Sequence, residues 1–136
     1  MQYTEKFQLG LWEPSDQVLH QSFNENTEKI EAALAQVADN MPRLATGTYT
    51  GTNKYTDKNP TVLTLPFPPK FLFIWGKSFA YYAHGIQGQP MVAHYDNGCV
   101  AMTTTWNGNT VSFYHNTSTS YQQNRSDDTY SYVALG

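Results

Sequence analysis

The most constraining feature of the sequence is a series of six residues with coiled-coil spacing. They are separated by 4, 3, 4, 3 and 4 positions, and only the second is polar: Phe23, Thr27, Ile30, Leu34, Val37 and Met41. Alternating steps of three and four place such residues on one narrow stripe of an α-helix. Pro42 follows directly, and a residue before proline avoids helical backbone angles. The sequence therefore predicts a helix over residues 22–41, ending before Pro42.

Local signals refine this helix and leave two interpretations open. Ser22 and Glu25 have the spacing of a capping box, and Glu25 and Lys29 that of an i,i+4 ion pair. The narrow stripe predicts a parallel coiled coil between copies of the chain, and our hypothesis is a homotrimer with these six residues as its seam. Because flanking alanines widen the stripe, the helix could instead lie on a sheet of its own chain. Fewer than three heptads do not hold a coiled coil alone, so other parts of the chain would have to help.

Composition changes at the end of this helix. Residues 1–44 carry seven acids and three bases, whereas residues 45–136 carry four acids, five bases and 16 of the 20 aromatic residues. Threonine and aromatic residues favour pleated, half-buried strands. We therefore place a boundary near Met41 and Pro42. Three parts result: an N-terminal arm (residues 1–21), a coiled-coil helix (22–41) and a β domain (42–136).

The arm and the β domain have recognisable local patterns. Residues 3–11 alternate weakly, which predicts an extended arm or strand that needs a pairing partner from elsewhere. In the β domain, apolar and threonine-rich runs separated by turn residues predict strands at 46–52, 61–65, 71–75, 79–83, 91–95, 99–106, 110–115 and 129–135. The run at 71–75 is apolar throughout, as in a strand buried on both faces. Asn107-Gly108 predicts a hairpin turn with two positive φ angles.

These elements define the expected fold class. We predict an α+β, mainly β chain that ends in an antiparallel β-sandwich, although the sequence does not distinguish a sandwich from a barrel. The expected core is Leu63, Leu72, Ile74, Val92, Val100, Met102, Val111, Phe113 and Val133. Cys99, the one cysteine, is expected to be a small core residue.

The sequence contains no recognisable catalytic chemistry. A glycine-rich phosphate loop, a His-Glu-x-x-His zinc pattern and a Gly-x-Ser-x-Gly elbow are all absent. The four histidines are too far apart in sequence for a local metal pair, and Asp57 and Asp96 give a glycosidase little choice of carboxylates. The net charge of −3 argues against nucleic-acid binding. We expect no enzyme, metal or cofactor, no membrane insertion and no signal peptide.

Neutral, aromatic composition favours a binding surface in the β domain. Sugars are bound by aromatic faces and neutral hydrogen-bonding groups, and Tyr and Trp supply contact area at low entropic cost. The same residues would also occur in the core of any β-sandwich, which is the competing interpretation. The candidates for receptor or glycan contact are Tyr81, Tyr82, His84, Trp106, Asn107, Tyr114, His115 and Tyr121.

Two regions of the chain resemble tail-fibre proteins of bacteriophages and prophages. Residues 3–19 resemble the arm of short tail proteins with a Tyr-x-Leu-x-x-Trp pattern, and residues 23–34 the Asp-Phe-Asn…Lys-Ile-Asp-x-Ala-Leu helix that follows it. Residues 47–51, 65–72, 106–114 and 130–136 resemble distal tail-fibre domains, which often end in Tyr-x-Tyr-Val-Ala-Ile-Gly. Ser22 stands where that pattern often has Asp, and Leu135 replaces Ile.

The resemblance implies a non-enzymatic, homotrimeric virion protein of the phage tail, made in the host cytoplasm. Its N-terminal part would attach to the tail tip or baseplate, with strand addition by the arm through Tyr3, Phe7, Leu9, Leu11 and Trp12. The β domain would bind a host-surface glycan or protein. Two alternatives remain: a baseplate or tail adaptor without a receptor role, and a small glycan-binding or glycan-degrading protein.

Overall fold

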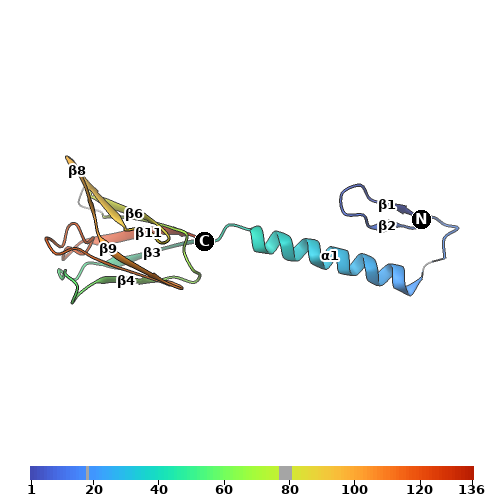
Figure 1. Cartoon of the computed structure of the whole chain (residues 1–136), viewed down its shortest axis with the longest axis horizontal. Helices are drawn as coiled ribbons and strands as arrows, with labels where there is room; N and C mark the ends of the chain where they lie inside the picture. Colours follow the sequence, from blue (N-terminus) through green and yellow to red (C-terminus); the bar gives the residue numbers. More distant parts are fainter. Residues whose placement is uncertain (18, 77–80) are drawn as a thin grey trace. The chain divides into compact units, whose positions relative to one another are not determined.

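The chain is mainly β and consists of two compact units. The computed structural model describes residues 1–17, 19–76 and 81–136. The first unit is Met1–Met41 and the second, which we call the β unit, is Pro42–Gly136. The first contains a small hairpin and the helix (Figure 1). The described residues of the β unit form nine strands in two antiparallel sheets. Within the described part of the chain, no helix is both long and apolar enough to cross a membrane.

The helix α1 spans His20–Asn40, so it ends just before Pro42, as predicted. Met41 has extended backbone angles, φ −69° and ψ 124°. The start differs from the expected one: Leu19 is the N-cap, and no side chain caps the helix there. Ser22 is inside the first turn, so the predicted capping box is wrong. The predicted Glu25–Lys29 pair is also not formed, because Lys29 Nζ donates a hydrogen bond to Gln8 O at 2.7 Å.

The N-terminal segment is not one extended arm. Strands β1 (Gln2–Tyr3) and β2 (Gly10–Leu11) pair antiparallel and form a short hairpin. Its loop is closed by hydrogen bonds from Gln8 N to Thr4 O and from Thr4 N to Leu9 O, with Gln8 at φ +54°. The prediction of an unpaired strand is therefore wrong for this segment, because the chain turns back and supplies its own partner.

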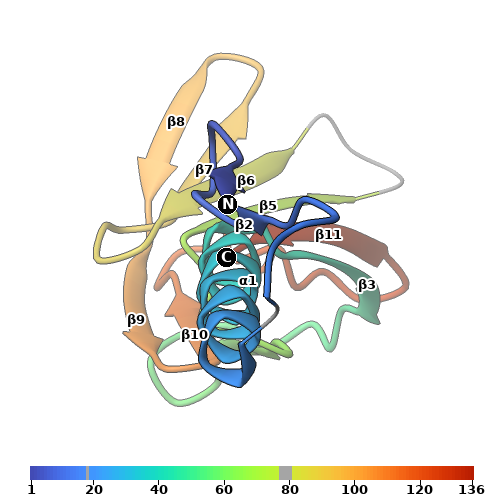
Figure 2. The ribbon, with the colours of Figure 1, turned by 90° about the vertical axis from the view of Figure 1, so that its right-hand side faces the viewer.

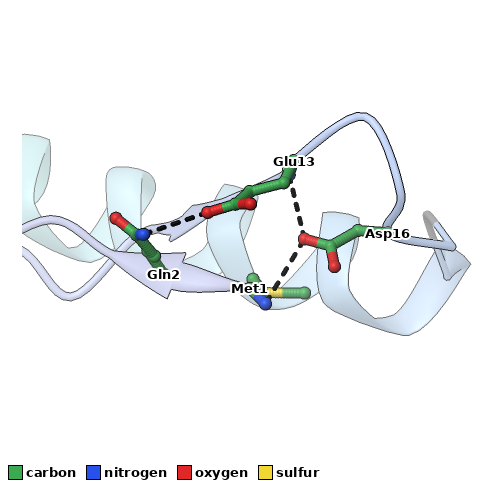
Figure 3. A network of polar contacts seen from close by, with 4 residues as sticks. All are labelled: Met1, Gln2, Glu13 and Asp16. Atoms are coloured by element: carbon green, nitrogen blue, oxygen red, sulfur yellow. Dashed lines mark hydrogen bonds and ion pairs between the residues drawn. The ribbon is translucent and has the colours of Figure 1, made fainter.

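A turn after the hairpin fastens the N-terminus (Figure 3). Asp16 Oδ2 accepts a hydrogen bond from Glu13 N at 2.9 Å and lies 3.3 Å from the Met1 ammonium. The hydrogen bond from Glu13 N, followed by the Met1 ammonium, lowers the pKa of Asp16. Gln2 Nε2 donates to Glu13 Oε1 at 3.0 Å. Met1 and Gln2 are thereby joined to the turn at residues 13–16, 11 or more positions away.

The hairpin is joined to the helix by polar contacts. Asn26 on α1 contacts Gly10 of β2 with both polar atoms of its amide. Its Oδ1 accepts from Gly10 N at 2.8 Å, and its Nδ2 donates to Gly10 O at 3.1 Å. Beside this contact, Phe7 and Leu9 of the hairpin and Ile30, Leu34 and Val37 of the helix line an apolar groove of about 200 Å³.

The larger sheet of the β unit has six strands, in the order β3-β11-β5-β6-β7-β8. Their bounds are Leu44–Thr50, Thr129–Leu135, Phe71–Gly76, Tyr82–Ile86, Val92–Tyr95 and Gly98–Ala101. The last strand, β11, lies between β3 and β5, and Arg43 and Gly136 exchange two backbone hydrogen bonds. The C-terminus therefore lies beside the start of the β unit (Figure 1). The strand predicted at 79–83 falls partly on residues 77–80, outside the described residues.

The smaller sheet has the order β4-β10-β9, with bounds Thr61–Thr64, Thr110–Tyr114 and Thr103–Asn107. The single strand expected at 99–106 is divided in two by Met102, where the chain passes from β8 into β9 of the other sheet (Figure 2). The predicted hairpin is confirmed by the pairing of β9 with β10. Its loop is Gly108–Asn109 rather than Asn107–Gly108, and Gly108 has a positive φ, +55°, whereas Asn107 does not, so the prediction of two positive φ angles is wrong.

Alternate side chains of both sheets meet in one core. The buried cluster is Leu63, Leu65, Leu72, Ile74, Ala83, Met91, Ala93, Met102, Val111, Phe113, Tyr130 and Ala134. Three expected members differ: Val92 and Val133 point out of the sheet and are half-buried, and Val100 packs against the cluster from its edge. The predicted phase is thus wrong by one residue in β7, where Met91 and Ala93 are the buried neighbours of Val92.

Strand β5 is buried on one face only. Leu72 and Ile74 are fully buried, whereas Phe71 and Phe73 are half-buried and Trp75 is 41% exposed. The expectation of two buried faces is therefore wrong for this strand. Cys99, expected in the core, is exposed on the same outward face, so that expectation is also wrong.

Candidate functional site

Three tyrosines and a histidine from separate parts of the β unit form a cluster, which we call the tyrosine cluster. Tyr121 is at its centre: its ring centroid lies 5.4 Å from Tyr95, 6.4 Å from Tyr81 and 5.2 Å from His115. The His115 ring meets Tyr121 edge-on at 85°. All four side chains are half-buried. Such rings present apolar edges and faces together with hydroxyl and imidazole groups.

Tyr121 is positioned by its neighbour Gln122, which is fully buried. The Gln122 side chain uses all of its hydrogen-bonding capacity. Its Oε1 accepts from Thr56 N and from His115 N, both at 3.1 Å. Its Nε2 donates to Asn59 O at 2.7 Å and to Thr61 Oγ1 at 3.3 Å. The loop that carries Tyr121 is therefore fastened to the loop at residues 51–60.

Asn124 and Tyr49 also join the loop that carries Tyr121 to the chain before it, at residues 49–54. Asn124 Nδ2 donates to Lys54 O at 2.7 Å and to Thr52 Oγ1 at 2.8 Å, and its Oδ1 accepts from Thr52 N at 3.0 Å. Tyr49 OH donates to the backbone oxygen of Gln123 at 2.7 Å. Burial raises the pKa of Tyr49 well above its ordinary value, so this hydroxyl remains a donor.

The backbone of these loops adopts unusual angles. Asn53, Thr56, Gln123 and Asp127 all have positive φ, and Thr56 is at +85°. Positive φ is costly for a β-branched residue such as threonine. A Cβ on Gly51 would lie 1.8 Å from Arg125 O, so only glycine fits there. Dense hydrogen bonding holds this strained backbone in one conformation and keeps the tyrosine cluster in place.

A second aromatic group lies on the outward face of the six-stranded sheet. Phe73 packs against Trp75 at 5.6 Å and against Tyr82 at 5.5 Å, and Tyr82 stacks on His94 at 4.7 Å. His84 Nε2 lies 2.9 Å from His94 Nε2, within hydrogen-bonding distance. Partial burial, followed by the charge of His94, lowers the pKa of His84.

The remaining candidates of the β unit lie apart from one another. The half-buried Trp106 donates its Nε1 proton to Gln89 O at 2.8 Å, and its ring lies beside Gly85. Asn107 is exposed at the end of β9, and Tyr114 is half-buried at the end of β10. The structure thus brings Tyr81, His115 and Tyr121 together, and separately Tyr82 and His84.

Sequence reasoning missed Tyr95 and His94 as members of these groups. Tyr95 joins the tyrosine cluster from the end of β7, and His94 is beside His84 because β6 and β7 are antiparallel neighbours. The histidines are ten positions apart, so no sequence-local spacing pointed to the pair. Among residues 1–17, 19–76 and 81–136, no three His, Cys, Asp or Glu side chains are arranged to hold a metal ion.

The helix seam is exposed along its length. Phe23, Ile30, Leu34, Val37 and Met41 are 46–64% exposed, and Thr27 donates its hydroxyl to Phe23 O at 3.0 Å. No residue of α1 is buried. Within the first unit, the predicted seam is therefore exposed surface that is apolar except at Thr27.

The expected attachment residues are mostly exposed on the hairpin. Tyr3, Phe7 and Leu11 are 47–58% exposed, and Leu9 is half-buried. Trp12 is also half-buried, and its Nε1 is buried without a hydrogen-bond partner in the described structure. Lys29 and Lys6 place their ammonium groups 5.6 and 5.5 Å from the Tyr3 and Phe7 rings. These residues form an amphipathic, cation-bearing surface on the first unit.

Comparison with protein-family models, curated proteins and solved structures finds no match. Function therefore rests on the residues of this chain. The tyrosine cluster can bind a neutral, polar ligand by stacking and hydrogen bonding.

Proposed function

We propose that this chain is a phage tail-fibre protein that binds a glycan of the host surface through its β unit. The observation that carries the proposal is the tyrosine cluster, in which Tyr81, Tyr95, His115 and Tyr121 offer ring faces and neutral hydrogen-bonding groups at one place. Sugar rings stack on aromatic faces, and their hydroxyls match phenol and imidazole groups. The buried Gln122 and Asn124 preorganise the loop, which lowers the entropic cost of binding.

The proposal includes assembly into a homotrimer. The exposed seam of α1 supports it, since five large apolar side chains at heptad spacing are stable in water when a partner helix covers them. Ile30 and Leu34 at successive seam positions permit three strands. The two sheets of the β unit would form a sandwich, and the hairpin with Tyr3, Phe7, Leu11 and Trp12 would attach to the tail tip or baseplate.

The test of glycan binding compares two tyrosine substitutions in the full chain. Tyr121→Ala removes the central ring of the cluster, and Tyr3→Ala removes an equally aromatic side chain from the first unit. We expect Tyr121→Ala to weaken binding to purified host cell-wall polysaccharide at least about tenfold, since stacked aromatic contacts often dominate an interface. Tyr3→Ala should leave it unchanged. Equal binding by all three proteins would reject the cluster as the site.

One observation favours the adaptor role as a second candidate. Tyr3, Phe7 and Leu11 expose apolar surface on the hairpin, where a neighbouring tail protein would bind. An adaptor without receptor function would assemble on tails but bind no cell-wall polysaccharide. Tail incorporation and polysaccharide binding, measured on the same preparation, separate the two candidates. A polysaccharide-degradation assay addresses the enzymatic alternative.

A further inference from the structure

The two sheets of the β unit have very different outward faces. On the three-stranded sheet, seven of the eight outward residues carry a hydroxyl or amide group: Val62 is the exception, and the others are Thr64, Thr103, Thr105, Asn107, Thr110, Ser112 and Tyr114. Strand alternation and the burial patterns assign these positions to the outside. This face is suited to water.

The outward face of the six-stranded sheet is apolar and aromatic over its central strands. Its members are Leu44, Thr46, Thr48, Thr50, Phe71, Phe73, Trp75, Tyr82, His84, Ile86, Val92, His94, Cys99, Ala101, Thr129, Ser131, Val133 and Leu135. None of these residues is Asp, Glu, Lys or Arg. An uncharged, aromatic patch of this extent is typical of the centre of a protein interface.

One end of this face carries four large apolar side chains side by side, which we call the apolar row. Leu44 pairs with Leu135, Leu135 with Phe71, and Phe71 with Ile86, across four neighbouring strands. Leu44, Ile86 and Leu135 are 64%, 61% and 43% exposed. Beside the row, Ile86, Val92 and Ala101 help to line a shallow hollow of about 270 Å³. The face thus has both protruding apolar side chains and a recess that accepts one.

Chain continuity favours a second copy of this chain as the occupant of this face. Met41, the last seam residue, is 63% exposed, and Leu44 follows three residues later. Three residues span at most about 11 Å in any conformation. A copy of the chain that covers Met41 in a parallel bundle therefore brings its own Leu44, the first residue of its apolar row, within reach of this row.

We propose that the outward face of the six-stranded sheet, starting at the apolar row, is a second contact between copies of this chain, in addition to the helix seam that precedes it in the sequence. This inference rests on the proposed trimer. It supplies the additional association that a helix of fewer than three heptads needs. It also assigns the aromatic group around Phe73, Trp75 and Tyr82 to assembly, and leaves glycan binding to the tyrosine cluster.

Matched substitutions on the two outward faces test the inference. The double variant Leu44→Glu with Ile86→Glu places charge on the apolar row, and Val62→Glu places it on the other sheet at a residue that is 53% exposed. Leu34→Glu, at 64% exposure, interrupts the seam. All are made in the full chain, and the dissociation constant of the oligomer is measured by sedimentation equilibrium. Circular dichroism verifies that each variant keeps its strands and helix.

The expected result is a dissociation constant at least about tenfold higher for the double Glu variant, and within about twofold of wild type for Val62→Glu. The milder pair Leu44→Ser with Ile86→Thr should give a smaller increase in the same direction, which guards against misfolding of the charged variant. If both row variants behave like Val62→Glu while Leu34→Glu dissociates the oligomer, the inference is overturned and the trimer proposal stands.

Two other outcomes are equally decisive. A wild-type chain that is monomeric at about 100 μM overturns both the trimer and this second contact. Row variants that lose polysaccharide binding but keep the wild-type dissociation constant show that the face holds the glycan, which also overturns the inference.

Discussion

The two units of this chain differ in where their apolar side chains lie. In the β unit, twelve hydrophobic residues form a buried cluster, and Phe113, Leu72 and Ile74 are fully buried. In the first unit, Gly10 is the one buried residue among those described, and every seam residue of α1 is exposed. Burial of apolar surface is the main favourable term in folding. The β unit therefore has its own source of stability, whereas the described part of the first unit buries little apolar surface of its own.

The polar contacts show the same contrast. The hairpin is held to the helix by the half-buried amide of Asn26 and the exposed ammonium of Lys29, and individual hydrogen bonds contribute about 1 kcal/mol. In the β unit, Gln122 and Asn124 make their hydrogen bonds out of water, where loss of a partner is costly. In the β unit, polar contacts add to the stability of a hydrophobic core. In the first unit, they join the hairpin to the helix without such a core.

The largest expected effect is the difference in unfolding free energy between two Phe→Ala variants, one in each unit. Phe113→Ala removes a fully buried ring of the β unit and should lower the free energy of unfolding by about 3–5 kcal/mol. Phe23→Ala, at 59% exposure on α1, should cost less than about 0.5 kcal/mol in a dilute monomer. Chemical denaturation at low protein concentration measures both. Equal costs would mean that the first unit buries its apolar side chains within one chain.

A buried amide gives the next largest effect. Gln122→Ala removes an acceptor of two hydrogen bonds and a donor of two more, and should lower the unfolding free energy by about 2–3 kcal/mol. Gln89→Ala is the control, since the Gln89 side chain is exposed. Thermal denaturation compares the two variants. Loss of Gln122 should also weaken polysaccharide binding, because it positions Tyr121.

The corresponding amide of the first unit should matter less. Asn26→Ala removes both contacts to the Gly10 backbone and should destabilise the hairpin by about 1 kcal/mol. The readout is faster hydrogen exchange at the Gly10 amide. Asn24→Ala, which removes a 3.3 Å contact with the exposed His20 ring, is the control and should leave that rate unchanged. A protected Gly10 amide in Asn26→Ala would show that apolar contacts hold the hairpin.

The smallest expected effect is a pH dependence of the β unit. Burial and His94 lower the pKa of His84 below its ordinary value of about 6.5, so the unfolded chain binds a proton more readily than the folded one. The contribution of His84 is complete above about pH 6.5 and is lost as the pH falls through the lowered value. His84→Gln should therefore flatten the decline in melting temperature between about pH 7.5 and 5.5. His20→Gln, outside the β unit, should not.

Local patterns were sufficient for the elements that depend on neighbours in sequence. Pro42 ends the helix because its geometry acts on Met41 alone. The strand at 129–135 was predicted with its observed bounds, and the hairpin at Gly108 because a turn signal acts over a few residues. The helix start was missed by two residues, because no side chain caps it and the Ser22 signal had no structural consequence.

Local sequence patterns could not predict which residues pair when they are far apart in the sequence. The N-terminal segment alternates like an extended strand, but Gln8 turns it back, and the pairing of Tyr3 with Gly10 decides its fold. Met102 divides one apparent strand between two sheets. The position of Met91 and Ala93 in the core, rather than Val92, depends on a register set by neighbouring strands.

The sequence by itself determined that the chain has a helix with a heptad seam, a boundary at Pro42 and a β half almost without charge. Residue spacing and composition are local properties, so they can be read from the sequence without knowing which strands pair. Only the tertiary structure decided that Tyr81, Tyr95, His115 and Tyr121 meet in one cluster, and that one sheet has a hydroxyl-rich outward face and the other an aromatic one. Sheet order and register bring together residues far apart in sequence, and no local pattern encodes that proximity.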